Sequence, residues 1–397
     1  MMNGNDLICF CNDWDGDPLS KKQIVTRLAQ QNRILWVNST GTRNPTVSAH
    51  DFRRAWKKLR DFSSGSRTVA KNISVFSPLV IPFHGNRLAR WLNRHILSWS
   101  LRRACQTLGF RKPITLTFVP SSAGVAGSLG ERLVIYYCVD EYSQFTGTDR
   151  AAIANMEQTL MERSDLVVVS SSRLLETKLP YNRNTRLISH GVDVDHFRKA
   201  CFAGTAIPAD CPVTKGPVIG FFGLIADWVD LEVVRYMAKA RPEWTVLMIG
   251  EIRTDISTLR ELPNVHLLGR RDYKSLPGYC KAFDVAILPF VVNELTLAAN
   301  PLKLREYLAA GLPVVATPLP EVCTMGSLVR TALSPEDFLR EVQASLDSGK
   351  HGPDRAISQC MDGDSWDARV EELTALIEEL HGESERVRTA ITAEQVA

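Results

Sequence analysis

Short apolar runs alternate with segments of helical periodicity along most of the chain. The runs contain few polar positions, and in the segments that follow them apolar residues recur at helical intervals. Such runs are typical of parallel strands buried on both faces. The pattern predicts strands at 7–11, 34–38, 133–139, 218–222, 245–249, 265–268, 285–289 and 312–316, and helices at 19–30 and 230–240. We therefore expect an α/β fold with doubly wound sheets.

With 397 residues, the chain is too long for one hydrophobic core and fits two domains. Residues 199–216 are rich in loop-forming residues and divide the two halves. We expect a first domain over 1–199 and a second over 217–365. An amphipathic helix is expected over 366–381, and residues 382–397 are expected to form a flexible tail.

The total net charge of +3 hides an asymmetry between the two halves. Residues 1–200 contain 28 Lys and Arg against 16 Asp and Glu, whereas residues 201–397 contain 19 against 28. Positive charge is concentrated at 51–113, where fourteen Lys and Arg accompany only Asp51 and Asp61. Such a field suits an anionic lipid surface or a polyanion. We expect the first domain to contact an anionic membrane surface, and we expect no nucleic-acid partner.

The chain shows no sign of membrane insertion or secretion. No apolar run approaches the roughly 20 residues of a transmembrane helix, and the N-terminus lacks the residue order of a signal peptide. The nine cysteines have no paired metal-binding spacing, so reduced thiols are expected. We expect a cytoplasmic protein that is peripheral at the inner face of the cytoplasmic membrane.

A helix in the last third of the chain carries charged groups in its first two turns. Asn300 is expected to be its N-cap, Pro301 its first residue, and Gly311 its end. Lys303 adds positive charge to the helix N-terminus, an arrangement that favours a bound anion such as a diphosphate. Glu306 lies on the same face and can accept hydrogen bonds from ribose hydroxyls. The alternative is a surface pair between Lys303 and Glu306.

Through this helix the chain resembles the GT-B glycosyltransferases, in which a Glu at the start of such a helix holds the donor ribose and a basic residue holds the pyrophosphate. The resemblance covers about residues 5–380. It is closest to bacterial exopolysaccharide and teichuronic-acid-type transferases, with the xanthan glucuronosyltransferase more distant. It implies two Rossmann-like domains facing each other across a cleft, the first binding the acceptor and the second the nucleotide sugar. It also implies a C-terminal helix that crosses back to the first domain.

One departure from the family leaves the stereochemistry open. Many retaining members carry a second Glu eight residues before the ribose-binding one, and this chain has Ala298 there. The retaining mechanism is therefore not implied by the resemblance.

Loops after the strands of the second domain are expected to bind the donor, because ligands of open α/β sheets lie outside the carboxyl ends of the strands. Gly223 lets backbone amides approach a phosphate, and Trp228 is expected to cover the donor; a turn with a packed Trp is the alternative. The nucleotide base is expected to stack on the guanidinium of Arg270 or on the ring of Tyr273. The alternative is that these residues belong to a charged surface turn. The expected donor-binding residues are His190, Gly223, Asp227, Trp228, Arg270, Tyr273, Thr296, Asn300, Lys303 and Glu306.

Asp140 follows an apolar strand of the first domain and is expected at the carboxyl edge of its sheet, facing the interdomain cleft. An inverting transferase needs a carboxylate that accepts the proton of the acceptor hydroxyl. Asp140 is our candidate for this base, and the resembling glucuronosyltransferase has its catalytic Asp at a comparable strand end. The alternative is that Asp140 is a helix N-cap.

Asp13, Asp15 and Gly16 also follow a strand and precede a helix. Asp17 and Pro18 satisfy the preferences for an N-cap and a first helical turn, which leaves the two earlier carboxylates for acceptor hydroxyls. A structural cap and a metal site are the alternatives. Because the lysine of the donor helix can neutralise a diphosphate without metal, we expect no metal site and no cofactor besides the nucleotide-sugar co-substrate.

Residues 87–109 combine helical periodicity with basic and aromatic residues. Trp91 and Trp99 lie at helical spacing among five arginines. Such a helix can lie in a membrane interface. Packing in the core is equally consistent with the pattern, since Leu97 and Leu101 broaden the apolar face.

Together these features favour a metal-independent glycosyltransferase. It would move a sugar from a nucleotide diphosphate to a hydroxyl of a lipid-linked or polysaccharide acceptor in cell-surface or exopolysaccharide biosynthesis. Two alternatives stay open: a nucleotide-sugar epimerase with the same layout, and a nucleotide-sugar-binding subunit whose catalytic residues have decayed. A nicotinamide dehydrogenase is disfavoured, because no Gly-x-Gly-x-x-Gly follows an early strand.

Overall fold

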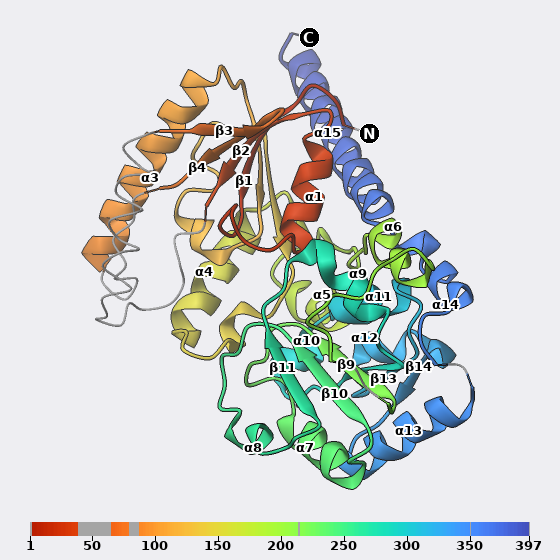
Figure 1. Cartoon of the computed structure of the whole chain (residues 1–397). Helices are drawn as coiled ribbons and strands as arrows, with labels where there is room; N and C mark the ends of the chain where they lie inside the picture. The colour runs from red at the N-terminus through yellow and green to blue at the C-terminus, as the bar shows by residue number, and fades with distance from the viewer. Residues whose placement is uncertain (1, 39–64, 79–86, 213–214, 350, 397) are drawn as a thin grey trace. The chain divides into compact units, whose positions relative to one another are not determined.

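The computed structural model of the chain describes residues 2–38, 65–78, 87–212, 215–349 and 351–396. The chain divides into two compact units (Figure 1). The first consists of Met1–Ser189 and Arg369–Ala397, and the second of His190–Ala368. Each unit contains a mainly parallel sheet with helices packed on it, so the predicted α/β class is confirmed.

The sheet of the first unit has the strand order β3-β4-β2-β1-β5-β6-β7-β8. All neighbouring strands are parallel except β3 and β4, which are antiparallel. The strands are β1 (Asp6–Phe10), β2 (Arg33–Val37), β3 (Arg67–Ala70), β4 (Ile73–Phe76), β5 (Ile114–Thr117), β6 (Leu133–Cys138), β7 (Leu166–Val169) and β8 (Thr185–Leu187).

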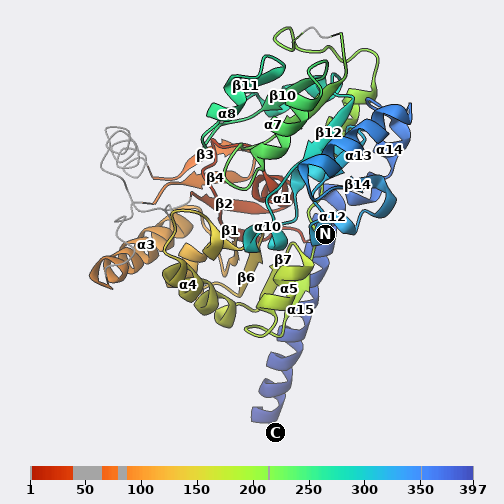
Figure 2. The same cartoon turned by 90° about the horizontal axis from the view of Figure 1, so that it is seen from below.

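Helices cover both faces of this sheet. Helices α3 and α4 lie on one face and α1 on the other (Figures 1 and 2). Within the described residues of the first unit, the helices that precede the boundary are α1 (Ser20–Leu28), α3 (Arg87–Thr107), α4 (Arg150–Arg163) and α5 (Ser172–Lys178). Helix α15 (Trp366–Val396) begins in the second unit and belongs to the first from Arg369 onward. It continues to Val396, through residues that the sequence pattern assigned to a tail.

The sheet of the second unit is parallel throughout, with the order β11-β10-β9-β12-β13-β14. Its strands are β9 (Val218–Phe222), β10 (Thr245–Ile249), β11 (Val265–Gly269), β12 (Val285–Leu288), β13 (Val314–Ala316) and β14 (Val329–Thr331). Its helices are α6 (Val194–Phe197), α7 (Leu231–Ala240), α8 (Ser257–Arg260), α9 (Leu276–Cys280), α10 (Glu294–Ala298), α11 (Leu302–Ala309), α12 (Pro320–Cys323), α13 (Pro335–Asp347) and α14 (Arg355–Gln359).

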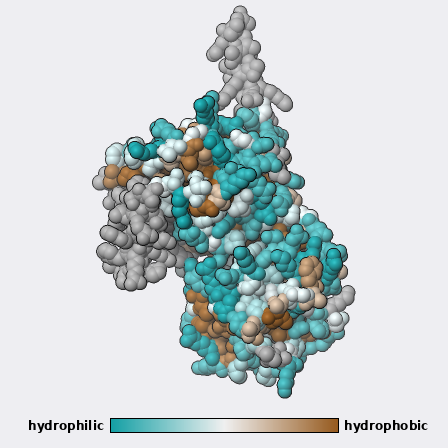
Figure 3. Space-filling model, turned by 45° about the horizontal axis from the view of Figure 1, so that its top comes forward, coloured by the Kyte–Doolittle hydropathy of each residue, from teal (hydrophilic) through white to brown (hydrophobic). Residues whose placement is uncertain are grey.

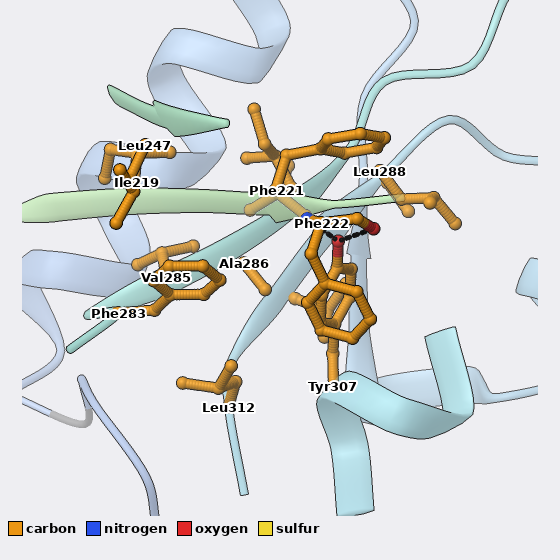
Figure 4. Close-up of a cluster of buried hydrophobic side chains, with 14 of the residues drawn as sticks. Ile219, Phe221, Phe222, Leu247, Phe283, Val285, Ala286, Leu288, Tyr307 and Leu312 are labelled. Carbon is orange, nitrogen blue, oxygen red and sulfur yellow. Dashed lines mark hydrogen bonds between the residues drawn. The ribbon is translucent and has the colours of Figure 1, made fainter. Parts of the chain in front are cut away.

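The core of the second unit is densely packed around its central strand, β9 (Figure 4). Ile219 and Phe221 are buried among side chains of the neighbouring strands. Between them, a side chain at Gly220 would start 2.0 Å from the ring of Phe283, so only glycine fits beside that ring. Strand β9 is thereby held close to the segment that precedes β12.

The division between the units falls at Ser189/His190, ahead of the loop-rich stretch that the sequence suggested as a boundary. Helix α6 and the 3-10 turn Arg198–Cys201 pack against α9, α11 and α14 of the second unit. The His196 ring also stacks on Tyr273, in the 3-10 turn just before α9, at 4.5 Å between centroids. These contacts make the segment after His190 part of the second unit.

In the part of the chain that the structure describes, no helix is both long and apolar enough to cross a bilayer. On the face shown in Figure 3, hydrophobic residues form separate patches on a mainly hydrophilic surface. All nine cysteines are free thiols.

Candidate functional site

Three glycines mark the carboxyl ends of adjacent strands in the second unit. Gly223 follows β9, Gly250 follows β10 and Gly269 ends β11. The amide of Gly223 donates to Ile249 O at 2.8 Å, and that of Gly250 donates to Gly269 O at 2.9 Å. A Cβ at Gly250 would lie 1.7 Å from Gly223 O, so no other residue fits there. The absence of side chains brings the backbone of β9 and β10 unusually close at this edge.

Lys303, in the first turn of α11, lies directly over Gly223. A Cβ at Gly223 would start 2.9 Å from Lys303 Cε, and the φ angle of Gly223 is +147°. The ammonium group, the helix N-terminus and the backbone of the strand end therefore occupy one region. Since the strand order reverses between β9 and β12, this is also where an open α/β sheet binds ligands. The region suits an anion.

Glu306 follows one turn later on α11 and is partly exposed. Burial raises the pKa of its carboxyl, whereas the charge of Lys303 acts to lower it. The two predicted donor residues are thus close enough to interact, and the carboxylate can accept hydrogen bonds from neighbouring hydroxyls.

Tyr307, which the sequence analysis did not single out, joins α11 to the end of β9. Its hydroxyl accepts a hydrogen bond from Phe222 N at 2.9 Å and donates one to Phe222 O at 3.2 Å (Figure 4). The two rings meet edge to face at 4.7 Å. Burial raises the pKa of the phenol well above its usual value, so it stays protonated. Tyr307 therefore aligns the helix that carries Lys303 with the strand end that carries Gly223.

The prediction that Asn300 is the N-cap of this helix is wrong. Helix α11 begins at Leu302, because Pro301 is extended (ψ 111°) and occupies the N-cap position without a side-chain cap. Asn300 is buried instead, where its Oδ1 accepts from Arg305 Nη1 and its Nδ2 donates to Glu321 Oε2 at 3.4 Å. Its role in the structure is to tie the start of α11 to α12.

Other predicted donor residues have structural partners. Thr296 is buried, and its hydroxyl takes part in a capping box with Asn293 at the start of α10. Trp228 packs against the hydrophobic core, which matches the packed-Trp alternative, and its carbonyl accepts from Val291 N at 2.9 Å. Asp227 beside it is exposed.

Arg270 and Tyr273 occupy different environments. Arg270 is exposed, whereas Tyr273 is half-buried, with its ring stacked on that of His196 and in edge contact with that of Phe197. His196 Nε2 also lies 2.9 Å from Tyr273 O. One face of the Tyr273 ring is therefore already stacked within the unit.

His190 is buried at the start of the second unit, with its ring 5.8 Å from that of Trp366. The neighbouring Gly191 has no room for a side chain, since a Cβ there would lie 2.8 Å from the backbone of Trp366. The geometry shows His190 in the packing between the first segment of the unit and the start of α15.

In the first unit, Asp140 follows β6 and is half-buried. It is not a helix N-cap, because Glu141 takes that position before the 3-10 turn Tyr142–Gln144. Its charge acts on Lys21, a buried lysine at the start of α1 that the sequence analysis missed. Burial lowers the pKa of Lys21, and Asp140 opposes that shift. Lys21 Nζ also donates to Asn12 Oδ1 at 3.0 Å.

A buried ionic network supports this strand end. Lys178 Nζ lies 2.6 Å from Glu141 Oε2 and 2.9 Å from Glu157 Oε2. Tyr136 Oη donates to Glu157 at 2.5 Å. Although burial alone lowers the pKa of Lys178, the two carboxylates raise it above its usual value. The network ties the side chain of Glu141, next to Asp140, to side chains of β6, α4 and α5.

The loop with the predicted acceptor residues is exposed. The Asp15 carboxylate lies 3.2 Å from Arg67 Nη2, and Gly16 N donates to Asp13 O at 3.1 Å. The prediction that Asp17 caps the following helix is wrong, because Leu19 holds the N-cap position of α1. Within the described ranges, no three His, Cys, Asp or Glu side chains are grouped so that they could hold a metal ion.

Comparisons with known proteins agree with this architecture. Residues 216–348 match the family model of glycosyl transferases group 1. Over 187 residues the chain is 34% identical to TuaH of Bacillus subtilis (strain 168), which is assigned to teichuronic acid biosynthesis as a glycosyltransferase. That match covers 44% of this chain and 46% of TuaH, so the chain matches less than half the length of this relative.

Solved structures are similar over nearly the whole chain. Sucrose-phosphate synthase from Thermosynechococcus elongatus has a TM-score of 0.67 and 15% identity, covering 96% of this chain and 100% of that one. HepE of Anabaena, in complex with UDP and glucose, has a TM-score of 0.63 and 14% identity, covering 94% and 99%. The chain has the GT-B fold of glycosyltransferases, and its second unit matches the family of glycosyl transferases group 1.

Proposed function

We propose that this protein is a glycosyltransferase that moves a sugar from a nucleotide-diphosphate sugar to a hydroxyl of a lipid-linked or polysaccharide acceptor in the cytoplasm. The observation that carries the proposal is the position of Lys303 over Gly223, with Glu306 one turn further along the same helix. A cation at a helix N-terminus suits the diphosphate, and a carboxylate suits the ribose. TuaH's part in teichuronic acid biosynthesis and the UDP bound by HepE support this substrate class.

The proposed reaction needs no metal ion. The oxygen of the acceptor hydroxyl attacks the anomeric carbon of the donor. Asp140 accepts the proton that this hydroxyl releases. The bond from that carbon to the diphosphate oxygen breaks, and the departing diphosphate takes the electron pair. Lys303 and the amides at the start of α11 stabilise the charge that develops on it.

Nucleotide binding tests the donor half of the proposal. Calorimetry with UDP and other nucleoside diphosphates, in EDTA, compares the wild type with Lys303→Ala and Glu306→Ala. Each variant loses a charged hydrogen bond worth about 1.5–3 kcal/mol, so affinity should fall at least about tenfold. Lys239→Ala and Glu261→Ala, at exposed positions of the same unit, are the controls. Unchanged affinity in both site variants would remove the donor site from α11.

Product analysis separates the proposed function from its two alternatives. The protein is incubated with a panel of nucleotide sugars and membrane-lipid acceptors, and the products are identified by mass spectrometry. A glycosylated acceptor supports the transferase. Altered sugar formed from the donor alone would identify an epimerase, and donor binding with no product would identify a decayed binding subunit.

A further inference from the structure

Helix α3 has two faces, and the protein's own core accounts for only one of them. Leu97, Leu101, Ala104 and Cys105 are buried in a cluster with apolar residues of β1 and β2. The core-packing interpretation of this helix is therefore confirmed for that face.

The opposite face exposes two tryptophans. Trp91 is 57% exposed and Trp99 is 61% exposed, although most large apolar side chains of the described chain are buried. The Trp91 ring contacts His95 at 4.4 Å, and the guanidinium of Arg103 lies 5.8 Å from the centre of the Trp99 ring. Tryptophan prefers the boundary between apolar chains and polar headgroups, where its ring and its N–H are both accommodated.

A groove of about 590 Å³ runs along the same face. Its lining is basic, aromatic and polar, and none of the lining residues carries a carboxylate. The groove is lined by Arg94, His95, Ser98, Trp99, Arg102, Arg103, Gln106 and Ser128. Helix α3 itself has no Asp or Glu among its 21 residues. Part of the basic region predicted from the sequence, 51–113, lies outside the described residues, as do the side chains of Arg87 and Arg90.

We propose that the outer face of α3 docks on the surface of an anionic lipid bilayer. Charge complementarity selects this occupant, because cationic side chains attract anionic headgroups while the tryptophans enter the interface. This docking surface would bring the protein to the membrane in which a lipid-linked acceptor lies, and to that extent the inference rests on the proposed function. Binding to vesicles needs neither donor nor turnover, so it can fail or succeed independently of the transferase activity.

Vesicle flotation of the full-length protein tests the charges. Wild type should float with vesicles of phosphatidylglycerol and phosphatidylcholine, and binding should fall as salt rises. Arg94→Glu with Arg103→Glu should weaken binding by about tenfold or more. The control, Arg183→Glu with Arg186→Glu, changes the net charge equally at exposed positions of the same unit and should bind like wild type. Equal weakening in both pairs would overturn the assignment to α3.

The tryptophans give a second, charge-neutral test. Trp91→Ala with Trp99→Ala should weaken binding several-fold, whereas Tyr181→Ala with Leu187→Ala, two other exposed apolar positions, should not. Equal binding to vesicles of phosphatidylcholine alone would overturn the proposal, because the selection of anionic headgroups by charge would be absent. Loss of vesicle binding when a soluble anionic polysaccharide competes at equal charge would overturn it in favour of a non-lipid partner. UDP affinity should be the same in all of these variants, which separates this surface from the donor site.

Discussion

The polar groups at the carboxyl edges of the two sheets are assembled in different ways. In the second unit, the two charged groups of the candidate donor site, Lys303 and Glu306, lie on one short helix. In the first unit, the charge of the candidate base Asp140, which follows β6, interacts with that of Lys21, which lies on α1 and is far away in the sequence. One arrangement is local, and the other depends on how the sheet brings separate segments together.

The difference shows what each arrangement relies on. A helix sets the spacing of residues three apart, so Lys303 and Glu306 stay neighbours wherever α11 lies. Their position relative to Gly223 depends on the hydrogen bonds of Tyr307 with Phe222. The charges of Asp140 and Lys21 interact only because β6, which precedes Asp140, and β1, which precedes α1, belong to the same sheet.

The largest effect is expected at the candidate base. Asp140→Asn keeps the size of the side chain but cannot accept a proton, so transfer should fall about a hundredfold or more while UDP affinity stays unchanged. Rate measurements at saturating donor, with calorimetry on the same samples, check this. Transfer at near the wild-type rate would shift the role to Asp13 or Asp15, and their Asn variants would then be measured in the same assay.

Tyr307→Phe tests whether the local arrangement of α11 depends on its anchoring to β9. Removing the hydroxyl leaves the buried Phe222 amide without its partner, which should cost about 1–3 kcal/mol in the free energy of unfolding. UDP affinity should fall as well, because Lys303 is no longer aligned with Gly223. Urea unfolding and calorimetry measure the two effects. Tyr236→Phe, in the same unit, is the control, and an equal loss of stability there would contradict the assigned role.

Lys21→Met tests the non-local arrangement. Without the positive charge of Lys21, the ionised form of Asp140 should be less favoured, and the acidic limb of the profile of kcat/KM against pH should move up by about one pH unit. Lys71→Met, at an exposed turn, should leave the profile where it is. A limb that stays in place in Lys21→Met would show that the two groups are not coupled in catalysis.

The smallest effect is expected on stability at Glu306. Burial raises the pKa of this carboxyl in the folded state. Ionisation of Glu306 therefore disfavours the folded state at any pH above the ordinary pKa that a Glu carboxyl has in the unfolded chain. Glu306→Gln removes that penalty and should be slightly more stable than wild type at neutral pH, with the difference vanishing as the pH falls below the ordinary carboxyl range. Thermal unfolding across this pH range measures the effect, with Glu261→Gln as the control. The same pH dependence of stability in both variants would contradict the expectation.

The α/β class and several strands could be predicted because buried parallel strands leave a clear apolar signal. The predicted ranges 218–222 and 245–249 coincide with β9 and β10. Ends of helices were less predictable. The N-caps of α1 and α11 are Leu19 and Pro301, two residues beyond the predicted cap Asp17 and one residue beyond the predicted cap Asn300, because Leu19 and Pro301 adopt the extended backbone that precedes a helix.

By itself, the sequence determined the charged pair on α11 and the glycine after β9, since helical spacing and glycine content are local properties. Only the tertiary structure decided that Lys303 lies over Gly223, that Tyr307 anchors their alignment and that the charges of Lys21 and Asp140 interact. It also decided that Asn300 and Thr296 are buried in structural hydrogen bonds. The physical reason is that burial and partnership depend on segments that are distant in sequence, and a polar side chain gives no local sign of which distant group it will meet.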